Sequence, residues 1–406
     1  HTSAPEQAEA EATLEPEQAP TIQLAPPPAV RRHSKVSPTV LHPEIPVEQR
    51  HDYRIHDDTL GVGTPGEKFN RNIKAIRLLK RLEAEDRFAT PEEQEVLARY
   101  VGWGGLADCF DERHSKYAEL KALLTEDEYA AARASTLNAH YTTPVVIRAI
   151  YDTLSNMGFQ TGNILEPSCG VGNFFGCLPE TMAGSKLYGV ELDSLTGRIA
   201  QQLYQNASIT VQGYERVNYP KDFFDVAVGN VPFGSYQVND KAYNRLGFSI
   251  HNYFFAKALD QVRPGGIVAF VTSRYTLDSK DTTVRKYLAQ RAELLGAIRL
   301  PNNAFKANAG TEVVTDVIFL QKRDHIDLSE PAWVQLGESA NGFAVNHYFA
   351  DHPEMILGVQ TSENTQYGKQ DFTVAPMEGT SLENQLAGAI QNIHGVYTEA
   401  APADVE

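Results

Sequence analysis

The clearest pattern in this chain lies at residues 163–174, which read Asn163-Ile164-Leu165-Glu166-Pro167-Ser168-Cys169-Gly170-Val171-Gly172-Asn173-Phe174. An apolar run that ends in an acid predicts a short buried strand, and the glycines after it predict a turn that opens a helix. Glycine in such a turn lets a ligand approach the backbone closely, as in the first βα turn of nucleotide-binding folds. A Gly-x-Gly turn is also common without any ligand, so the pattern needs a second signal.

A second strand that ends in an acid supplies that signal. It follows after roughly twenty residues and reads Tyr188-Gly189-Val190-Glu191-Leu192-Asp193. This spacing is expected of a carboxylate that binds ribose hydroxyls. The two blocks together predict an α/β fold with a Rossmann-like sheet.

A third strand ends in residues suited to different chemistry. The apolar run at 224–229 leads into Asn230-Val231-Pro232-Phe233. Ligands of open α/β sheets bind at the carboxyl ends of strands. There the Asn230 amide oxygen and the Pro232 carbonyl can accept the two hydrogens of an exocyclic amine, while Phe233 stacks on the base. The same residues also fit a plain strand-to-loop turn.

These three blocks, in this order, resemble motifs I, II and IV of the N6-adenine DNA methyltransferases, which are class I enzymes dependent on S-adenosylmethionine. Most members have the target motif Asn-Pro-Pro-aromatic, and this chain departs from it at Val231. The resemblance covers residues 138–323, where the motif order is that of the gamma class. It implies a Rossmann-like methyltransferase sheet, S-adenosylmethionine as cofactor, no metal, and a catalytic set of Asn230, Val231, Pro232 and Phe233.

Further blocks extend the resemblance on both sides. Residues 138–144 resemble motif X, residues 213–215 fall at motif III, and Phe254 aligns with the motif V aromatic, although it equally fits a core position. Residues 299–320 resemble motif VIII, in which Phe305 would join Phe233 in stacking on a flipped base. The cofactor-binding residues that the resemblance implies are Tyr141, Thr143, Glu166, Ser168, Gly170, Gly172, Glu191, Leu192, Tyr214, Glu215 and Phe254.

Composition divides the chain into four parts. Residues 1–60 are rich in Pro, Ala, Glu and Gln and predict a disordered arm. Residues 61–137 predict a helical N-terminal region, because apolar residues recur there at helical spacing. Residues 138–323 form the expected methyltransferase domain, and residues 324–406 an acidic C-terminal extension. The apolar stripe of the helical region comprises Ile73, Ile76, Leu78, Leu79 and Leu82.

The helical region also holds signals at helix ends. Thr90 and Pro91 predict the N-cap and first residue of one helix, and Thr143 and Pro144 predict the same for a helix that runs to Met157. The stretch 100–105 has two aromatic residues and three glycines. It fits either a helix end with buried anchors or a nucleic-acid contact loop.

The formal net charge of −16 is unusual for a protein that binds nucleic acid. The acids, however, are concentrated at the two ends. Residues 324–406 carry 1 basic and 13 acidic side chains, while residues 67–323 carry 30 basic and 29 acidic ones. A nearly neutral central region can still present a basic face to DNA.

No apolar run approaches the ~18 residues of a membrane span. Three cysteines without metal-ligand spacing favour a cytoplasmic protein. Residues 60–66 and 100–105 also resemble the amino-terminal part of large methylase-helicase proteins of phages and conjugative elements, and this resemblance implies that the chain is encoded by a bacterium, a phage or a mobile element. The chain has no phosphate-binding loop of a helicase. A helicase portion or a specificity partner is therefore expected outside it.

Two function classes stay open at this point. The first is an adenine-specific DNA methyltransferase, whose site would serve an RNA base or a protein glutamine equally well in chemical terms. The second is a non-catalytic module that binds a partner, in which Val231 marks a lost activity. Turnover on DNA separates the two.

Overall fold

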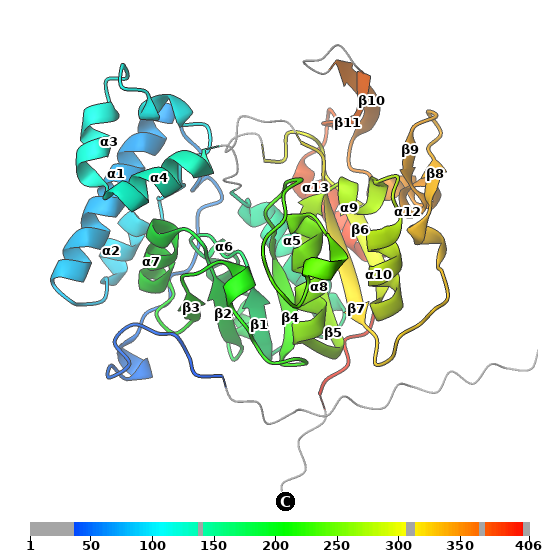
Figure 1. Cartoon of the computed structure of the whole chain (residues 1–406), viewed down its shortest axis with the longest axis horizontal. Helices are drawn as coiled ribbons and strands as arrows, with labels where there is room; N and C mark the ends of the chain where they lie inside the picture. Colours follow the sequence, from blue (N-terminus) through cyan, green and yellow to red (C-terminus); the bar gives the residue numbers. More distant parts are fainter. Residues whose placement is uncertain (1–35, 137–140, 306–312, 365–369, 401–406) are drawn as a thin grey trace, which may run out of the picture.

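The computed structural model describes residues 36–136, 141–305, 313–364 and 370–400 (Figure 1). Its centre is a seven-stranded sheet in the order β3-β2-β1-β4-β5-β7-β6, in which only β7 runs antiparallel to its neighbours. This arrangement confirms the predicted Rossmann-like α/β fold. The strands are β1 Asn163–Glu166, β2 Lys186–Val190, β3 Ser208–Thr210, β4 Phe224–Asn230, β5 Val262–Ser273, β6 Ala292–Arg299 and β7 Thr315–Lys322.

The strand order reverses at β1. Leu165 of β1 pairs with Tyr188 of β2 on one side and with Ala227 of β4 on the other. Parallel strands all end at the same edge, so the loops after β1, β2 and β4 meet beside this reversal. In open α/β sheets, the crevice at such a point is the usual ligand site.

Helices flank the sheet because its inner strands are apolar along their length. The whole of β4 before Asn230 is buried, as is usual for a parallel strand that is covered on both faces. Helix α8 packs along β5 and against α10, and α13 packs on α5. These helices are α5 Pro144–Asn156, α6 Asn173–Gly176, α7 Ser194–Leu203, α8 Ile250–Gln261, α9 Tyr275–Asp278, α10 Thr283–Arg291 and α13 Leu382–Ala389. Thr143 and Pro144 open α5 as predicted.

A bundle of four helices lies beside the β3 edge of the sheet and contacts α7 (Figure 1). The predicted apolar stripe of α1 is buried. Tyr100 and Trp103 are also buried, so the stretch 100–105 supplies core anchors and is not a nucleic-acid contact loop. The bundle consists of α1 Pro65–Ala84, α2 Pro91–Leu97, α3 Tyr117–Leu123 and α4 Glu126–Ser135. Capping boxes open three of its helices, at Thr64 with Glu67, Thr90 with Glu93, and Thr125 with Glu128.

The segment before the bundle is packed on the domain from residue 36 onward. The Tyr53 backbone N–H donates to the Leu203 carbonyl at 2.7 Å, and the Ile55 N–H donates to the Gly176 carbonyl at 2.9 Å. Tyr53 is buried. Residues 36–60 therefore differ from the disordered arm expected for residues 1–60, because apolar anchors among the polar residues hold them against α6 and α7.

The acidic C-terminal extension is packed on the sheet as well. Its buried residues join the apolar cluster of the central strands, and the Arg299 carbonyl of β6 accepts from the Leu357 N–H at 2.8 Å. The sequence-based division at residue 323 thus separates segments that share one core. The elements of the extension are β8 Leu336–Glu338, β9 Ala344–Asn346, α12 His347–Asp351, β10 Val359–Asn364, β11 Gln370–Ala375 and α13. None of the helices formed by the described residues combines the length and the apolar composition that a bilayer crossing needs.

A buried ion network joins the sheet to this extension. Arg299, at the end of β6, donates through Nε and Nη2 to the two carboxylate oxygens of Asp316 at 2.8 and 2.9 Å. Its Nη1 donates to Asp278 Oδ2 at 2.6 Å. The other Asp278 oxygen accepts from the Asn346 backbone N–H at 2.8 Å. All of the strong donors and acceptors of the network are thus paired, which buried charges require.

Replacing Arg299 with leucine should lower the free energy of unfolding by about 3–5 kcal/mol, because Asp316 would then stay buried without its two-point partner. Asp278 would keep its 3.2 Å contact with Arg274. Urea unfolding followed by circular dichroism measures the change. Arg113→Ala is the matched control, since the ion pair of Arg113 with Asp111 lies at the surface and its loss should not move the midpoint. Equal midpoints for Arg299→Leu and the wild type would contradict this role of the network.

Candidate cofactor and target-amine site

The turn after β1 has the geometry that its glycines predict. Gly170 and Gly172 have φ of 56° and 88°, in the left-handed region that favours glycine. A Cβ at Gly172 would lie 2.5 Å from the ring of Tyr204, whereas one at Gly170 would meet nothing within 4 Å. The Cys169 N–H donates to the Val190 carbonyl at 2.9 Å and fastens the turn to β2. The turn is thus held in place by its contacts at Cys169 and Gly172, while the space beside Gly170 is open.

Glu191, at the end of β2, lies beside this turn. One carboxylate oxygen accepts from the Gly170 N–H at 3.0 Å, and the other accepts from the Asp193 N–H at 2.8 Å. Burial raises the pKa of Glu191 to about 7, although these backbone N–H groups favour the ionised form. Its neighbour Leu192 is 73% exposed, and half-buried Ser168 lies in the turn after β1. The structure thus brings together Ser168, Gly170, Gly172, Glu191 and Leu192.

Glu166, at the end of β1, is a buried acid with an unused oxygen. The residue is 2% exposed, and its Oε2 has no hydrogen-bond partner among the described residues. Burial, followed by the nearby charge of Glu191, holds the pKa of Glu166 well above its usual range. A Cβ at Gly229 of β4 would lie 3.2 Å from Glu166 Cγ, so the acid fills the space between the two strand ends. A buried acceptor without a partner indicates a place for a ligand donor.

Asn230 shows a second unused acceptor. Its Nδ2 donates to Thr142 Oγ1 at 3.2 Å, and its buried Oδ1 has no partner among the described residues. The hydrogen bond to Thr142 fixes the amide so that Oδ1 is the atom left for another molecule. Thr142 was missed in the sequence, because nothing in its spacing distinguishes it from Thr143.

The rest of the predicted catalytic block follows β4 directly. The Val231 N–H donates to the Val271 carbonyl at 3.1 Å, and the Val231 side chain is buried. A proline at this position, as in most relatives, could not make that bond. Pro232 and Phe233 are half-buried, and Phe233 packs against the apolar core. The departure at Val231 therefore extends the pairing of β4 with β5 by one residue.

Tyr141 and Thr143 precede α5. Tyr141 is half-buried, and its ring lies against Gly61. Thr143 is the N-cap residue, and its side chain makes no capping hydrogen bond. The beginning of the predicted motif X, residues 138–140, lies outside the described residues.

The predicted aromatic residues fall into two groups. Tyr214 and Phe254 are buried with ring centroids 5.0 Å apart, and the Tyr214 hydroxyl donates to Gln261. Glu215 is half-buried in the turn after β3. Of the two alternatives predicted for Phe254, a ring beside the cofactor or a core residue, this packing agrees with the core residue.

Phe305 is 2% exposed and belongs to the central apolar cluster. Its ring is therefore not presented to a base in this arrangement, and residues 306–312 after it lie outside the described residues. An exposed ring at the same edge of the sheet is Tyr275, which follows β5 and is 49% exposed. The Arg274 guanidinium lies 4.4 Å from its centroid. An isolated tyrosine after a strand carries no sequence signal, so Tyr275 was missed.

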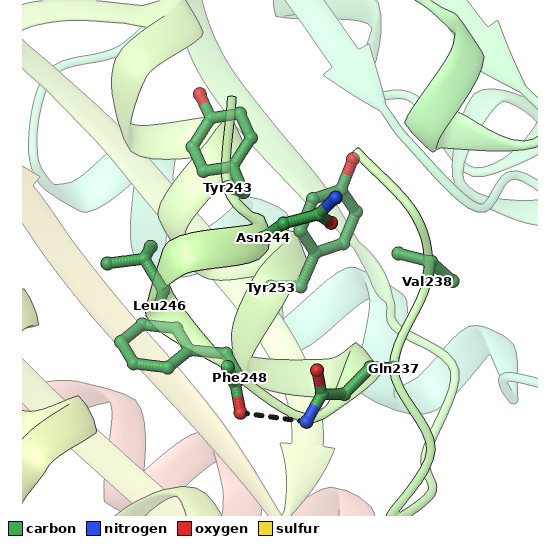
Figure 2. A pocket seen from close by; sticks show the side chains of 8 residues that line it. Gln237, Val238, Tyr243, Asn244, Leu246, Phe248 and Tyr253 are labelled. Carbon is green, nitrogen blue, oxygen red and sulfur yellow. Dashed lines mark hydrogen bonds between the residues drawn. The ribbon is translucent and has the colours of Figure 1, made fainter. Parts of the chain in front are cut away.

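A separate hollow lies in the connection between β4 and α8 (Figure 2). Gln237 Nε2 donates to the Gly247 carbonyl at 3.2 Å across it. Its lining includes Val238, Tyr243 and Phe248, but none of the predicted site residues. Within the described part of the chain, no three His, Cys, Asp or Glu side chains cluster in a way that could hold a metal ion.

A protein-family model described as N-6 DNA Methylase matches residues 123–341. The chain belongs to the N-6 DNA Methylase family. The match spans all three strand-end blocks, and it confirms the predicted methyltransferase class and S-adenosylmethionine as the cofactor. The left-handed glycine turn and the Glu166 oxygen, for which the described part of the chain offers no partner, fit that cofactor.

Relatives of this chain include the Defense against restriction protein B of Escherichia phage P1, which is 31% identical over 257 residues. That alignment covers 62% of this chain and 10% of the phage protein, so the chain spans about a tenth of its relative. Two similar solved structures are described as a class I S-adenosylmethionine-dependent methyltransferase from Listeria monocytogenes and a modification subunit of a type I restriction enzyme from Vibrio vulnificus YJ016. The first has 18% identity, a TM-score of 0.42 and coverage of 66% of this chain and 91% of its own. The second has 17% identity, a TM-score of 0.39 and coverage of 72% and 70%.

Glu191→Ala should raise the Kd for S-adenosylmethionine about tenfold or more, because a hydrogen bond to a charged acceptor contributes roughly 1.5–3 kcal/mol. Isothermal titration calorimetry gives the Kd. The surface variant Glu112→Ala is the control and should bind like the wild type. An unchanged Kd for Glu191→Ala would remove this acid from the site.

The same affinity should depend on pH. In the free protein Glu191 has a pKa of about 7, and donors from ribose favour its ionised form. Below that pH, binding must first release a proton, so affinity should rise as the pH increases from about 6 to 8. In Glu191→Gln this rise should disappear. A wild-type affinity that is flat or falls over this range would contradict the assignment.

Proposed function

We propose that this chain transfers a methyl group from S-adenosylmethionine to the N6 amine of an adenine in DNA that is flipped out of the helix. Residues 138–323 are the proposed catalytic domain. The observation that carries the proposal is the buried, unpartnered Oδ1 of Asn230, at the end of β4 and next to the strand reversal.

An exocyclic amine on a base ring has two hydrogens and a lone pair that is delocalised into the ring. Two acceptors held at fixed positions can orient both hydrogens, so that the lone pair faces the methyl donor. Asn230 Oδ1 is one such acceptor, and the Pro232 carbonyl, two residues further along a rigid turn, is the proposed second. Both would favour the positive charge that develops on the nitrogen during transfer.

S-adenosylmethionine supplies an electrophilic methyl group on a sulfonium centre. We assign its binding to the turn at Ser168 to Gly172, to Glu191 and Leu192 at the end of β2, and to Tyr141 and Thr143 before α5. Glu166 would offer its free oxygen to a donor in the same crevice. Glu215, Tyr214 and Phe254 would border the adenine side, with the two rings acting as packed support because they are already buried.

Phe233 would stack on the extruded adenine, since a base outside the helix needs an aromatic or apolar face to replace its neighbours. Its half-buried ring is held by the core, which leaves part of the ring for the ligand. The second face of the clamp is not assigned to Phe305, which is fully packed. Exposed Tyr275 is the better candidate for a contact near the DNA.

Val231 supports a catalytic protein over a module that has lost its activity. The valine keeps its side chain in the core and adds a backbone hydrogen bond to β5, while Asn230 retains its free oxygen. A change that had followed loss of function would have no reason to preserve that oxygen in a buried, ligand-facing state.

We further propose that site recognition comes from residues outside this chain or from a partner protein. The chain spans about a tenth of the phage relative, and its C-terminal extension is acidic. An acidic surface opposes phosphate and is poorly suited to sequence reading. The proposed setting is the cytoplasm of a bacterium that carries the phage or mobile element.

Asn230→Ala should abolish methylation while leaving the Kd for S-adenosylmethionine nearly unchanged, because Asn230 holds the target amine. Incubation with labelled S-adenosylmethionine and mixed DNA, followed by sequencing of modified adenines, measures the activity. Asn70→Ala, at an exposed position on α1, is the matched control. RNA and a glutamine-containing peptide serve as alternative substrates.

Label in RNA or peptide and none in DNA would overturn the proposed substrate. Full activity of Asn230→Ala on DNA would overturn the proposed mechanism. Cofactor binding without label in any substrate would favour the non-catalytic module.

A further inference from the structure

A strap, defined here as residues 53–61, crosses the back of the cofactor turn before it enters α1. Its N–H groups at Tyr53 and Ile55 donate to carbonyls at the ends of α7 and α6. Arg54 Nη2 donates to the Leu178 carbonyl at 2.9 Å. The strap therefore contacts both helices that follow the cofactor-binding strand ends.

The last part of the strap is fastened to α5. Arg148 of α5 donates through Nη1 to Asp58 Oδ1 at 2.7 Å and through Nη2 to Asp58 Oδ2 at 2.6 Å. This two-point geometry fixes the position of Asp58 as well as its distance. The hydrogen bonds from Arg148 lower the pKa of Asp58. Leu60, two residues later, is buried.

Gly61 then lies directly against Tyr141. A Cβ at Gly61 would stand 2.6, 2.7 and 2.9 Å from Cε1, Cζ and Cδ1 of the tyrosine ring, which is closer than any side chain can approach. The backbone of Gly61 is not in the left-handed region. Its lack of a side chain is therefore needed for the contact with Tyr141 and not for the conformation of the turn.

We propose that Gly61, Asp58 and Arg148 are positioning residues for the cofactor, because they hold the Tyr141 ring in the place where it contacts S-adenosylmethionine. The inference rests on the proposed function, which assigns Tyr141 to the cofactor. The Asp58 and Arg148 side chains are 50% and 41% exposed, and an ion pair at that exposure is weak. The close contact at Gly61 is the stronger constraint, and the ion pair keeps the strap in register with α5.

Gly61→Ala is the decisive variant, since one methyl group must displace the ring. Its Kd for S-adenosylmethionine should rise about tenfold, as expected when a contacting ring loses its place. The KM for the cofactor should rise in parallel, while kcat at saturating cofactor should stay unchanged. Gly66→Ala is the matched control, because a Cβ there meets nothing within 4 Å, and it should bind like the wild type.

Binding is measured by calorimetry on the full chain, and thermal unfolding midpoints are recorded for every variant. The same substitution is then made in a Tyr141→Ala background. If the strap acts through Tyr141, Gly61→Ala should have no further effect on the Kd there. A general loss of stability would instead weaken binding in both backgrounds, and that result would overturn the inference.

Asp58→Asn provides a second route if Gly61→Ala does not fold. It should weaken binding in the same direction by about twofold to threefold, and only while Tyr141 is present. Wild-type affinity in both strap variants, with Tyr141→Ala impaired, would overturn the inference and leave the proposed function intact. Wild-type affinity of Tyr141→Ala would remove the tyrosine from the cofactor site and the inference with it. The loss of methylation in Asn230→Ala tests the proposed function independently.

Discussion

Parallel pairing of β1 with both β2 and β4 is the constraint on which the rest of the site depends. Because β1 is the strand from which the chain winds in both directions, its carboxyl end is flanked by two other strand ends. Glu166, Glu191 and Asn230 are separated by tens of residues in the chain, yet each is the last residue of its strand or the next one after it. The parallel pairing of the three strands is therefore enough to place the two acids and the amide at one edge of the sheet.

This collection costs folding free energy. Glu166 is buried and Glu191 is half-buried at neighbouring strand ends, and the pKa of each is raised because burial disfavours the charged form. A group whose pKa is higher in the folded than in the unfolded state stabilises the fold at low pH, and that contribution is lost as the pH rises through the folded value. At neutral pH the free protein thus holds two acids whose charged forms are disfavoured by burial. A bound ligand with hydroxyl and amine donors would stabilise these charged forms. Acids with raised pKa values gather at functional sites, so this cost agrees with a binding site at the strand ends.

The parts outside the sheet contribute by holding its ends in place. Arg299 of β6 joins β7 and α9 through its contacts with Asp316 and Asp278, and Asp278 in turn accepts from the Asn346 N–H at the end of β9. The strap at 53–61 ties α6, α7 and α5 to one another. The charge of a segment does not predict whether it packs on the sheet. The C-terminal extension is acidic, but residues such as Val345, Phe349 and Val374 anchor it in the common core. Net charge describes a surface, and burial is decided by a few apolar residues at the right spacing.

The sequence alone determined the fold class, the strand ends and the glycine turn, because these follow from local apolar periodicity and from backbone conformations that only glycine adopts readily. The family followed from the resemblance of the strand-end motifs and their order to those of a known family. The sequence also placed Asn230 and Glu191 at the ends of their strands. It did not find Thr142, Tyr275 or the contact of Gly61 with Tyr141, and it predicted that Phe305 stacks on a flipped base, although this ring is buried. Those features depend on which side chains face each other across segments 80 or more residues apart, and on whether a ring points into the core or toward solvent. Neither property has a local signature, because a strand or turn specifies its own backbone, while its neighbours in space are set only when the whole sheet and its helices pack.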